Sequence, residues 1–221
     1  DLHNKNFKDQ FYLVLTGIFI ASLVASNLIF QKFFTWNFLG INFELSVGII
    51  AYPVTFLVTD LISELYGQKR ANQVVVSGFF ASVFTTLLVL VSVNASAVEW
   101  SPIDDMTFTK VFGLTGPAFF ASMVAYLTAQ LIDVRIFHFW KRLTKGKHLW
   151  LRNNASTIFS QLVDTSVILV ILCLAGVIEW ERFYGLWMMG WLFKVLVALI
   201  DTPIIYGIIY LLKGKIDIAK E

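Results

Sequence analysis

The chain contains 221 residues, of which 57% are hydrophobic and only 14% are charged, and its formal net charge at pH 7 is +2. Its mean hydropathy of +0.73 excludes an ordinary soluble globular domain, because soluble proteins do not sustain repeated apolar windows of membrane-spanning length. The single cysteine, Cys173, excludes a disulfide framework and a cysteine-based metal site. The composition therefore predicts an integral membrane protein.

Six apolar segments are long enough to cross a hydrocarbon core, which takes about 20 helical residues at about 1.5 Å each. They cover residues 10–30, 44–66, 71–93, 114–138, 154–178 and 184–212. The first segment is too long for a signal-peptide core, so we expect it to be retained. The predicted fold is all-α: a polytopic membrane protein with six transmembrane helices and a single transmembrane domain over residues 1–221.

Basic residues are concentrated in alternate connections between the predicted spans. The N-terminal segment, the connections after the second and fourth spans and the C-terminal tail hold most of the 17 Lys and Arg residues, whereas the other connections are richer in acidic residues. The positive-inside rule therefore predicts that both termini are cytoplasmic. The basic stretch at 141–147 is interpreted as part of this pattern beside membrane lipid, and no nucleic-acid partner is expected.

A short match between two stretches of the sequence suggests that the chain consists of two similar halves. Residues 25–34 and 128–137 share an order of polar and apolar residues, and Asp60 falls on Asp164 at about the same offset. Two halves of three spans each must have opposite orientations, so the match favours a 3+3 inverted repeat, as in many secondary transporters. Short matches between apolar helices also arise by chance.

Polar side chains interrupt four of the predicted spans at helical spacing. An ionised side chain near the bilayer centre costs about 2.5–3.5 kcal/mol on insertion scales, so such residues must face protein or water. The residues are Asp60 and Glu64 in 44–66, Gln130 and Asp133 in 114–138, Asn154, Thr157, Gln161 and Asp164 in 154–178, and Lys194 and Asp201 in 184–212. Each set lies on one helical face. Pro53 and Pro203 predict kinks in two of these helices.

Structural roles explain some of these residues. The side chains of Gln130, Thr157 and Ser160 could merely form hydrogen bonds between helices. Lys194 could simply neutralise Asp164 or Asp201. Glu64 and Asp133 lie near the predicted cytoplasmic ends and could pair with basic residues there. Stability alone does not explain the three aspartates at 60, 164 and 201, because buried ion pairs are at best near break-even against apolar residues. We therefore favour a functional site.

The chemistry of the set fits a flat polar heterocycle. Carboxylates accept from paired N–H groups, Lys donates to carbonyls, and aromatic rings stack, which together suit a guanine-like base. Proton coupling through one carboxylate is an open alternative. The chain carries no metalloprotease, serine hydrolase or phosphate-loop motif, and an aspartyl protease pair lacks any flanking signature, so we expect no enzyme, metal or cofactor. The asymmetry of the set argues against a channel.

The stretches at 58–67 (VTDLISELYG), 128–165 and 193–206 (FKVLVALIDTPIIY) resemble the bacterial queuosine precursor transporter family, within the vitamin uptake transporter group. The resemblance is strongest at RNNASTxxSQxxDT, residues 152–165. It implies a six-helix protein of the bacterial inner membrane that imports 7-deazaguanine bases for the tRNA modification queuosine. The motif positions are Asp60, Gln130, Asp133, Arg152, Asn154, Ser156, Thr157, Gln161, Asp164, Lys194 and Asp201.

Together these observations predict import of a 7-deazaguanine base by alternating access. The expected substrate-binding residues are Asp60, Gln130, Asn154, Thr157, Gln161, Asp164, Lys194 and Asp201, and Glu64, Asp133 and Arg152 are expected at the cytoplasmic mouth. The base would lie between spans two, five and six, and Asp60 or Asp201 would orient Lys194 or carry a coupling proton. The alternatives are a substrate-binding subunit for another vitamin, energised by a separate ATPase, and an assembly protein without a substrate; a homodimer is left open.

Overall fold

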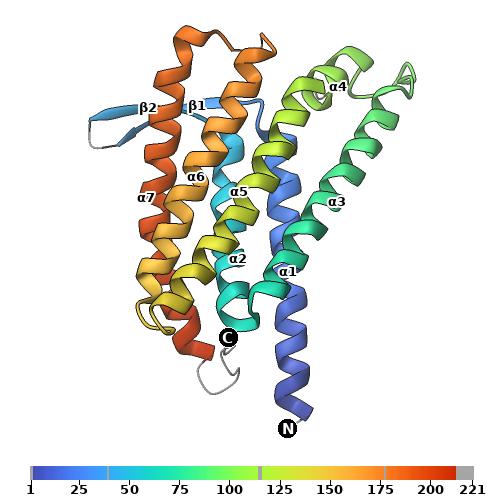
Figure 1. The fold of residues 1–221 in the computed structure, drawn as a ribbon. Coiled ribbons are helices and arrows are strands. Elements are labelled where there is room, and N and C mark those ends of the chain that lie inside the picture. The colour runs from blue at the N-terminus through green and yellow to red at the C-terminus, as the bar shows by residue number, and fades with distance from the viewer. Residues whose placement is uncertain (1, 39, 114–115, 177, 213–221) are drawn as a thin grey trace.

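A computed structural model describes residues 2–38, 40–113, 116–176 and 178–212 as a bundle of long helices with a small β-hairpin at one side (Figure 1). The described helices are α1 (Leu2–Ile29), α2 (Tyr52–Tyr66), α3 (Gln68–Val93), α4 (Asp105–Phe112), α5 (Gly116–Leu143), α6 (Leu149–Leu174) and α7 (Trp180–Leu212), with a 3₁₀ helix η1 (Val47–Ile50). The two strands, β1 (Phe33–Phe38) and β2 (Ile41–Ser46), pair antiparallel. The all-α prediction is confirmed for the bundle, and the hairpin is an addition to it.

Five segments are long and apolar enough to cross a membrane, counting only the residues that the structure describes. They are Asn6–Ile29, Val47–Tyr66, Gln68–Val93, Leu149–Leu174 and Trp180–Leu212. The protein is therefore a multi-pass membrane protein. Helix α5 has 28 residues, a length of about 42 Å, but is not among the five. Gln130, Asp133 and Arg135 make it more polar than its neighbours, and the sixth span stays a prediction.

The start of the second predicted span is corrected by the hairpin. Residues 44–46 belong to β2, and the α-helix begins only at Tyr52. Phe43 and Leu45 are buried while Glu44 between them is exposed, which is the alternation of a strand with one face covered. Pro53 occupies the first turn of α2, where its missing N–H costs no helical hydrogen bond, so the predicted break at this proline is a helix start.

Several other helix boundaries extend beyond the predicted spans, whereas α6 ends at Leu174, before its predicted end at 178. Helix α1 begins at Leu2, α5 continues to Leu143, and α6 begins at Leu149, five residues before its predicted start at 154. The turn between α5 and α6 is tight because Lys145, Gly146 and His148 all adopt positive φ. Helix α7 is a single helix that continues through Pro203.

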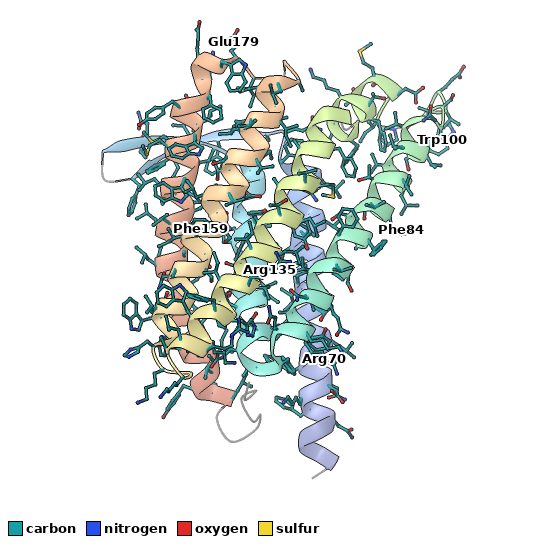
Figure 2. All side chains as sticks on the ribbon, in the orientation of Figure 1. Arg70, Phe84, Trp100, Arg135, Phe159 and Glu179 are labelled. Carbon is teal, nitrogen blue, oxygen red and sulfur yellow. The ribbon has the colours of Figure 1, made fainter. Side chains whose placement is uncertain are left out.

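The connections divide between two ends of the bundle. Figure 1 shows the α2–α3 and α5–α6 connections at the same end as the beginning of α1 and the end of α7. Arg70 lies at this end, and Trp100 and Glu179 lie at the opposite end (Figure 2). The basic α2–α3 and α5–α6 connections thus lie at one end of the bundle. The cytoplasmic placement of that end and the inverted repeat stay predictions.

Helix α2 lies at the centre of the bundle. Its residues 58–65 are all buried, and it packs against α1, α3, α5 and α7. Large apolar side chains instead cover much of the exterior; Phe84 projects outward from α3 with 61% of its surface exposed (Figure 2). Apolar side chains outside and polar ones inside are the distribution that a lipid-embedded bundle requires.

Candidate functional site

A pocket opens between α2, α6 and α7, beside η1. Four polar residues line it: Thr157 and Gln161 from α6, and Lys194 and Asp201 from α7. Its apolar lining consists of Ile49, Tyr52, Pro53, Phe56, Val197 and Ala198. These three helices correspond to predicted spans two, five and six, so the pocket lies between the helices that the polar stripes pointed to.

Asp164 and Lys194 form an ion pair beside this pocket. Lys194 Nζ lies 2.5 Å from Asp164 Oδ2, and it also donates to Thr165 Oγ1 over 3.1 Å. The Tyr52 hydroxyl donates to the other carboxylate oxygen, Asp164 Oδ1, over 2.9 Å. Lys194 Nζ also stands 5.2 Å from the centre of the Tyr52 ring, within reach of a cation–π interaction. The pair is largely buried and its geometry is held by three helices.

A second polar group lies deeper, where α6 meets α2 and α5. The Thr157 hydroxyl donates to Asp60 Oδ2 over 3.4 Å, and the Ser160 hydroxyl donates to Asp133 Oδ1 over 2.9 Å. Both aspartates are buried, and their donors Thr157 and Ser160 stand about one turn apart on one face of α6, which brings the two carboxyl groups close together. Thr157 belongs to the pocket lining as well, so a single hydroxyl joins this group to the pocket.

Four predicted substrate ligands lie outside the pocket lining: Asp60, Gln130, Asn154 and Asp164. Asp164 is joined to the lining through Lys194, and Asp60 through Thr157. Gln130 is fully buried between α5 and α2, where it accepts from Thr59 over 3.3 Å and donates to Thr55 over 3.2 Å. Asn154 donates to the Thr202 hydroxyl of α7 and to the Trp150 carbonyl, each over 2.8 Å. In this structure Gln130 and Asn154 form hydrogen bonds between helices. Direct contact of either residue with a substrate stays a prediction.

A buried charge network lies near the basic end of the bundle. Arg152 donates to Glu64 Oε1 over 2.6 Å, and Lys141 Nζ lies 3.5 Å from Glu64 Oε2. The Arg152 guanidinium also donates to the carbonyls of Gly146 and Lys147, each over 3.1 Å, in the turn between α5 and α6. The network therefore ties α2, α5 and α6 together at this end. It contains Glu64 and Arg152, two of the residues predicted at the cytoplasmic mouth.

Tyr52 and Thr165 are site residues that the sequence analysis missed. Tyr52 stands one step before Phe56 in the series Tyr52, Phe56, Asp60 and Glu64, in which each residue follows the last by four. Because residues four apart share a helical face, extending the series backward would have found the tyrosine. Thr165 carries no comparable signal, since it sits beside Asp164 in sequence and contacts Lys194 only through packing of α6 on α7.

Within residues 2–38, 40–113, 116–176 and 178–212, no group of three or more His, Cys, Asp or Glu side chains could hold a metal ion. What the interior does offer is a pocket bordered by a carboxylate, an ammonium, a carboxamide and aromatic rings, inside a bundle with an apolar exterior. Fold and site are thus those of a polytopic membrane protein with a polar site in its interior, an arrangement typical of secondary transporters.

The chain belongs to the family described as "Putative vitamin uptake transporter", whose model matches residues 46–208. A protein of Bacillus subtilis (strain 168) named "Probable queuosine precursor transporter" is 29% identical over 167 residues, covering 73% of this chain and 70% of that protein. The "Queuosine precursor transporter" of Escherichia coli (strain K12) is 24% identical over 209 residues, covering 93% of this chain and 88% of that protein.

A further relative, from Haemophilus influenzae, is also named "Probable queuosine precursor transporter" and is 27% identical over 172 residues, 76% of this chain and 69% of that protein. No solved structure matches this chain. The family match confirms the resemblance seen in the motifs and the prediction that this is a transporter and not an enzyme.

Proposed function

We propose that this protein imports a queuosine precursor, a 7-deazaguanine base, across the bacterial inner membrane by alternating access. Three curated relatives named as queuosine precursor transporters support the substrate class. The observation that carries the proposal is the Asp164–Lys194 pair beside a pocket with aromatic walls. An acceptor and a donor held side by side match a base edge on which N–H groups adjoin a carbonyl.

The base enters the site by exchanging partners with this ion pair. Asp164 accepts from the lactam N–H and the exocyclic amine, and Lys194 turns its ammonium toward the ring carbonyl. Gln161 supports this pose, because its Oε1 is buried and has no hydrogen-bond partner in the described part of the chain. A buried acceptor without a donor is costly, so an N–H of the base would relieve that cost. Tyr52 and Phe56 supply the aromatic wall.

The Glu64 network serves as the cytoplasmic gate in this account. It joins α2 to the α5–α6 turn at the end of the bundle where basic segments gather. Alternating access requires that the exit on one side be closed while the pocket opens on the other. The buried pairs of Glu64 with Arg152 and Lys141 close that end, and releasing the base requires them to separate.

Uptake in a bacterial strain that cannot synthesise the base tests the site assignment. Asp164→Asn and Lys194→Ala should each abolish queuosine in tRNA when the base is supplied in the medium. Lys110→Ala, which removes an exposed lysine on α4, is the matched control and should leave it unchanged. Wild-type queuosine levels in both site variants would overturn the assignment. Transport by the purified protein in liposomes separates this proposal from a binding subunit that requires a partner ATPase.

A further inference from the structure

Asp60 on α2 and Asp133 on α5 form a pair of carboxyl groups in the interior of the bundle. Only 2% of the Asp60 surface and none of the Asp133 surface is exposed. Helix α6 brings the two groups together, because Thr157, which donates to Asp60, and Ser160, which donates to Asp133, stand about one turn apart on the same face of that helix. Two ionised carboxylates in contact, away from water, repel strongly, and each also loses its hydration. The pair is therefore stable only if a proton or another cation lies between the two carboxyl groups.

The hydrogen bonds around the pair leave one oxygen of each residue without a donor. Thr157 donates to Asp60 Oδ2 and Ser160 donates to Asp133 Oδ1. The remaining oxygens, Asp60 Oδ1 and Asp133 Oδ2, are buried and have no hydrogen-bond partner in the described part of the chain. One proton on either carboxyl group, donated to the other, would remove the repulsion and give the pair the donor it lacks.

The surrounding groups do not replace that proton. Helix α6 faces the pair with the hydroxyls of Ser156, Thr157 and Ser160, and α7 contributes Asp201, which adds negative charge near Asp60. The guanidinium of Arg152 from α6 is directed to Glu64, one turn further along α2. Lys141 of α5 likewise lies against the Glu64 carboxylate. Lys194 of α7 is paired with Asp164. Arg152, Lys141 and Lys194 are thus each bound to a carboxylate other than Asp60 and Asp133.

We propose that Asp60 and Asp133 share one proton, and that this proton is the coupling ion for uptake of the base. The proposal rests on the proposed function. It assigns the coupling proton to the Asp60–Asp133 pair, where the sequence alone left Asp60 and Asp201 as alternative carriers. Thr157 connects the two events, because it lines the pocket and also donates to Asp60. The proton enters with the base from the outer side and leaves to cytoplasmic water, and no other bond changes.

Loss of the proton drives the next conformational step. Two adjacent carboxylates without it repel each other and push α2 away from α5. Glu64 follows Asp60 by one helical turn, so this movement strains its ion pairs with Arg152 and Lys141 and favours opening of the gate. The shared proton therefore holds the gate end closed after it has entered with the base, and its loss to cytoplasmic water favours the open gate.

Purified protein in liposomes tests the coupling with 7-cyano-7-deazaguanine as the probe. The wild type should exchange labelled base for unlabelled base, and it should also accumulate base when the interior is alkaline, with proton uptake reported by a trapped pH dye. Asp133→Asn should lose the pH-driven accumulation and retain exchange, because an amide supplies the missing donor permanently. Asp60→Asn should lose the pH-driven accumulation as well. Glu179→Gln, an exposed acid at the other end, should behave as wild type. Accumulation at the wild-type level in both aspartate variants would overturn the proposal.

Infrared spectroscopy gives an independent test that needs no transported base. The wild-type protein at neutral pH should show the carbonyl stretch of a protonated carboxyl group, and this band should be missing from both aspartate variants. A band that persists unchanged in both variants would overturn the shared proton even if the base is transported. A band that behaves as expected in a protein that does not exchange the base would uphold the shared proton while refuting the proposed substrate.

Discussion

The hydroxyl of Tyr52 on α2 donates to Asp164 Oδ1 on α6 over 2.9 Å. This bond fixes the carboxylate that we assign to the base, because Lys194 holds only the other oxygen. Tyr52→Phe removes the bond and keeps the ring beneath the ammonium. Hydrogen bonds to charged groups are worth about 1.5–3 kcal/mol, so we expect a loss of about tenfold or more in the apparent affinity for the base.

The measurement for Tyr52→Phe is the concentration dependence of uptake in liposomes. Tyr210→Phe is the control, since that side chain is 75% exposed on α7. Tyr52→Ala should have a lower apparent affinity for the base than Tyr52→Phe, because it also removes the ring that faces Lys194. Equal affinity in Tyr52→Phe and the wild type would show that the hydroxyl does not position Asp164 for binding.

Gly78 marks a close approach between α3 and its neighbours. A Cβ at this position would lie 2.6 Å from a ring atom of Phe19 and 2.8 Å from the Tyr126 hydroxyl, which itself donates to the Val75 carbonyl. Gly78→Ala should therefore destabilise the protein by about 1–3 kcal/mol through overpacking. Thermal unfolding in detergent measures the change, and Gly185→Ala, which meets nothing within 4 Å, should be neutral or slightly stabilising. A higher unfolding temperature for Gly78→Ala would contradict the packing described for α1, α3 and α5.

The buried pair of Glu64 and Arg152 should be strongly coupled. Removing one partner leaves an uncompensated charge inside the bundle, which costs about 3–5 kcal/mol. Glu64→Gln and Arg152→Gln should each lower stability, and the double variant should lose much less than the sum of the two.

A double-mutant cycle on chemical unfolding measures that coupling. The exposed pair of Glu179 and Arg182, 3.8 Å apart and more than 70% exposed on both sides, provides the control cycle, in which coupling should be close to zero. Additive effects at Glu64 and Arg152 would mean that the gate is not held by this ion pair.

The hairpin is held to α7 through aromatic contacts. The ring of Phe193 lies 5.6 Å from that of Trp36 and 6.2 Å from that of Phe43, with edge-on geometry in both cases. Phe193→Ala should loosen residues 33–46, because aromatic pairs contribute about 0.5–1.5 kcal/mol each beyond buried area. Hydrogen exchange of the hairpin amides should rise in this variant and not in Phe80→Ala, whose side chain is exposed on α3. Unchanged exchange would show that the hairpin is held by other contacts.

The helices and the polar stripes were predictable because their signals are local. Apolar runs set the positions of the long helices, and the spacing of Asp60 and Glu64, or of Lys194 and Asp201, places each pair on one face wherever the helix packs. The hairpin was missed because its strands are short, and because residues 44–46 at the end of β2 run directly into the apolar η1 and α2, with no glycine or proline between β2 and η1. The alternation of Phe43, Glu44 and Leu45 was the signal that could have separated it.

The ion-pair and hydrogen-bond partners of these residues could not be predicted from the sequence, because they depend on how the helices pack. The sequence left Asp164 and Asp201 as alternative partners for Lys194, and the structure places the ammonium on Asp164 while Asp201 lines the pocket. Gln130 shares a stripe with Asp133, yet its amide is taken up by Thr55 and Thr59 of α2. Such outcomes follow from how far each helix is rotated toward its neighbours, which a single stripe does not specify.

Direct binding to the purified protein tests most simply whether Asp164 binds the base. Titration with 7-cyano-7-deazaguanine should show saturable binding to the wild type and to Glu179→Gln. Asp164→Asn should bind at least about tenfold more weakly, because the carboxylate loses its charge and presents an amide donor to the N–H groups of the base. Equal affinity in Asp164→Asn and the wild type would contradict the account.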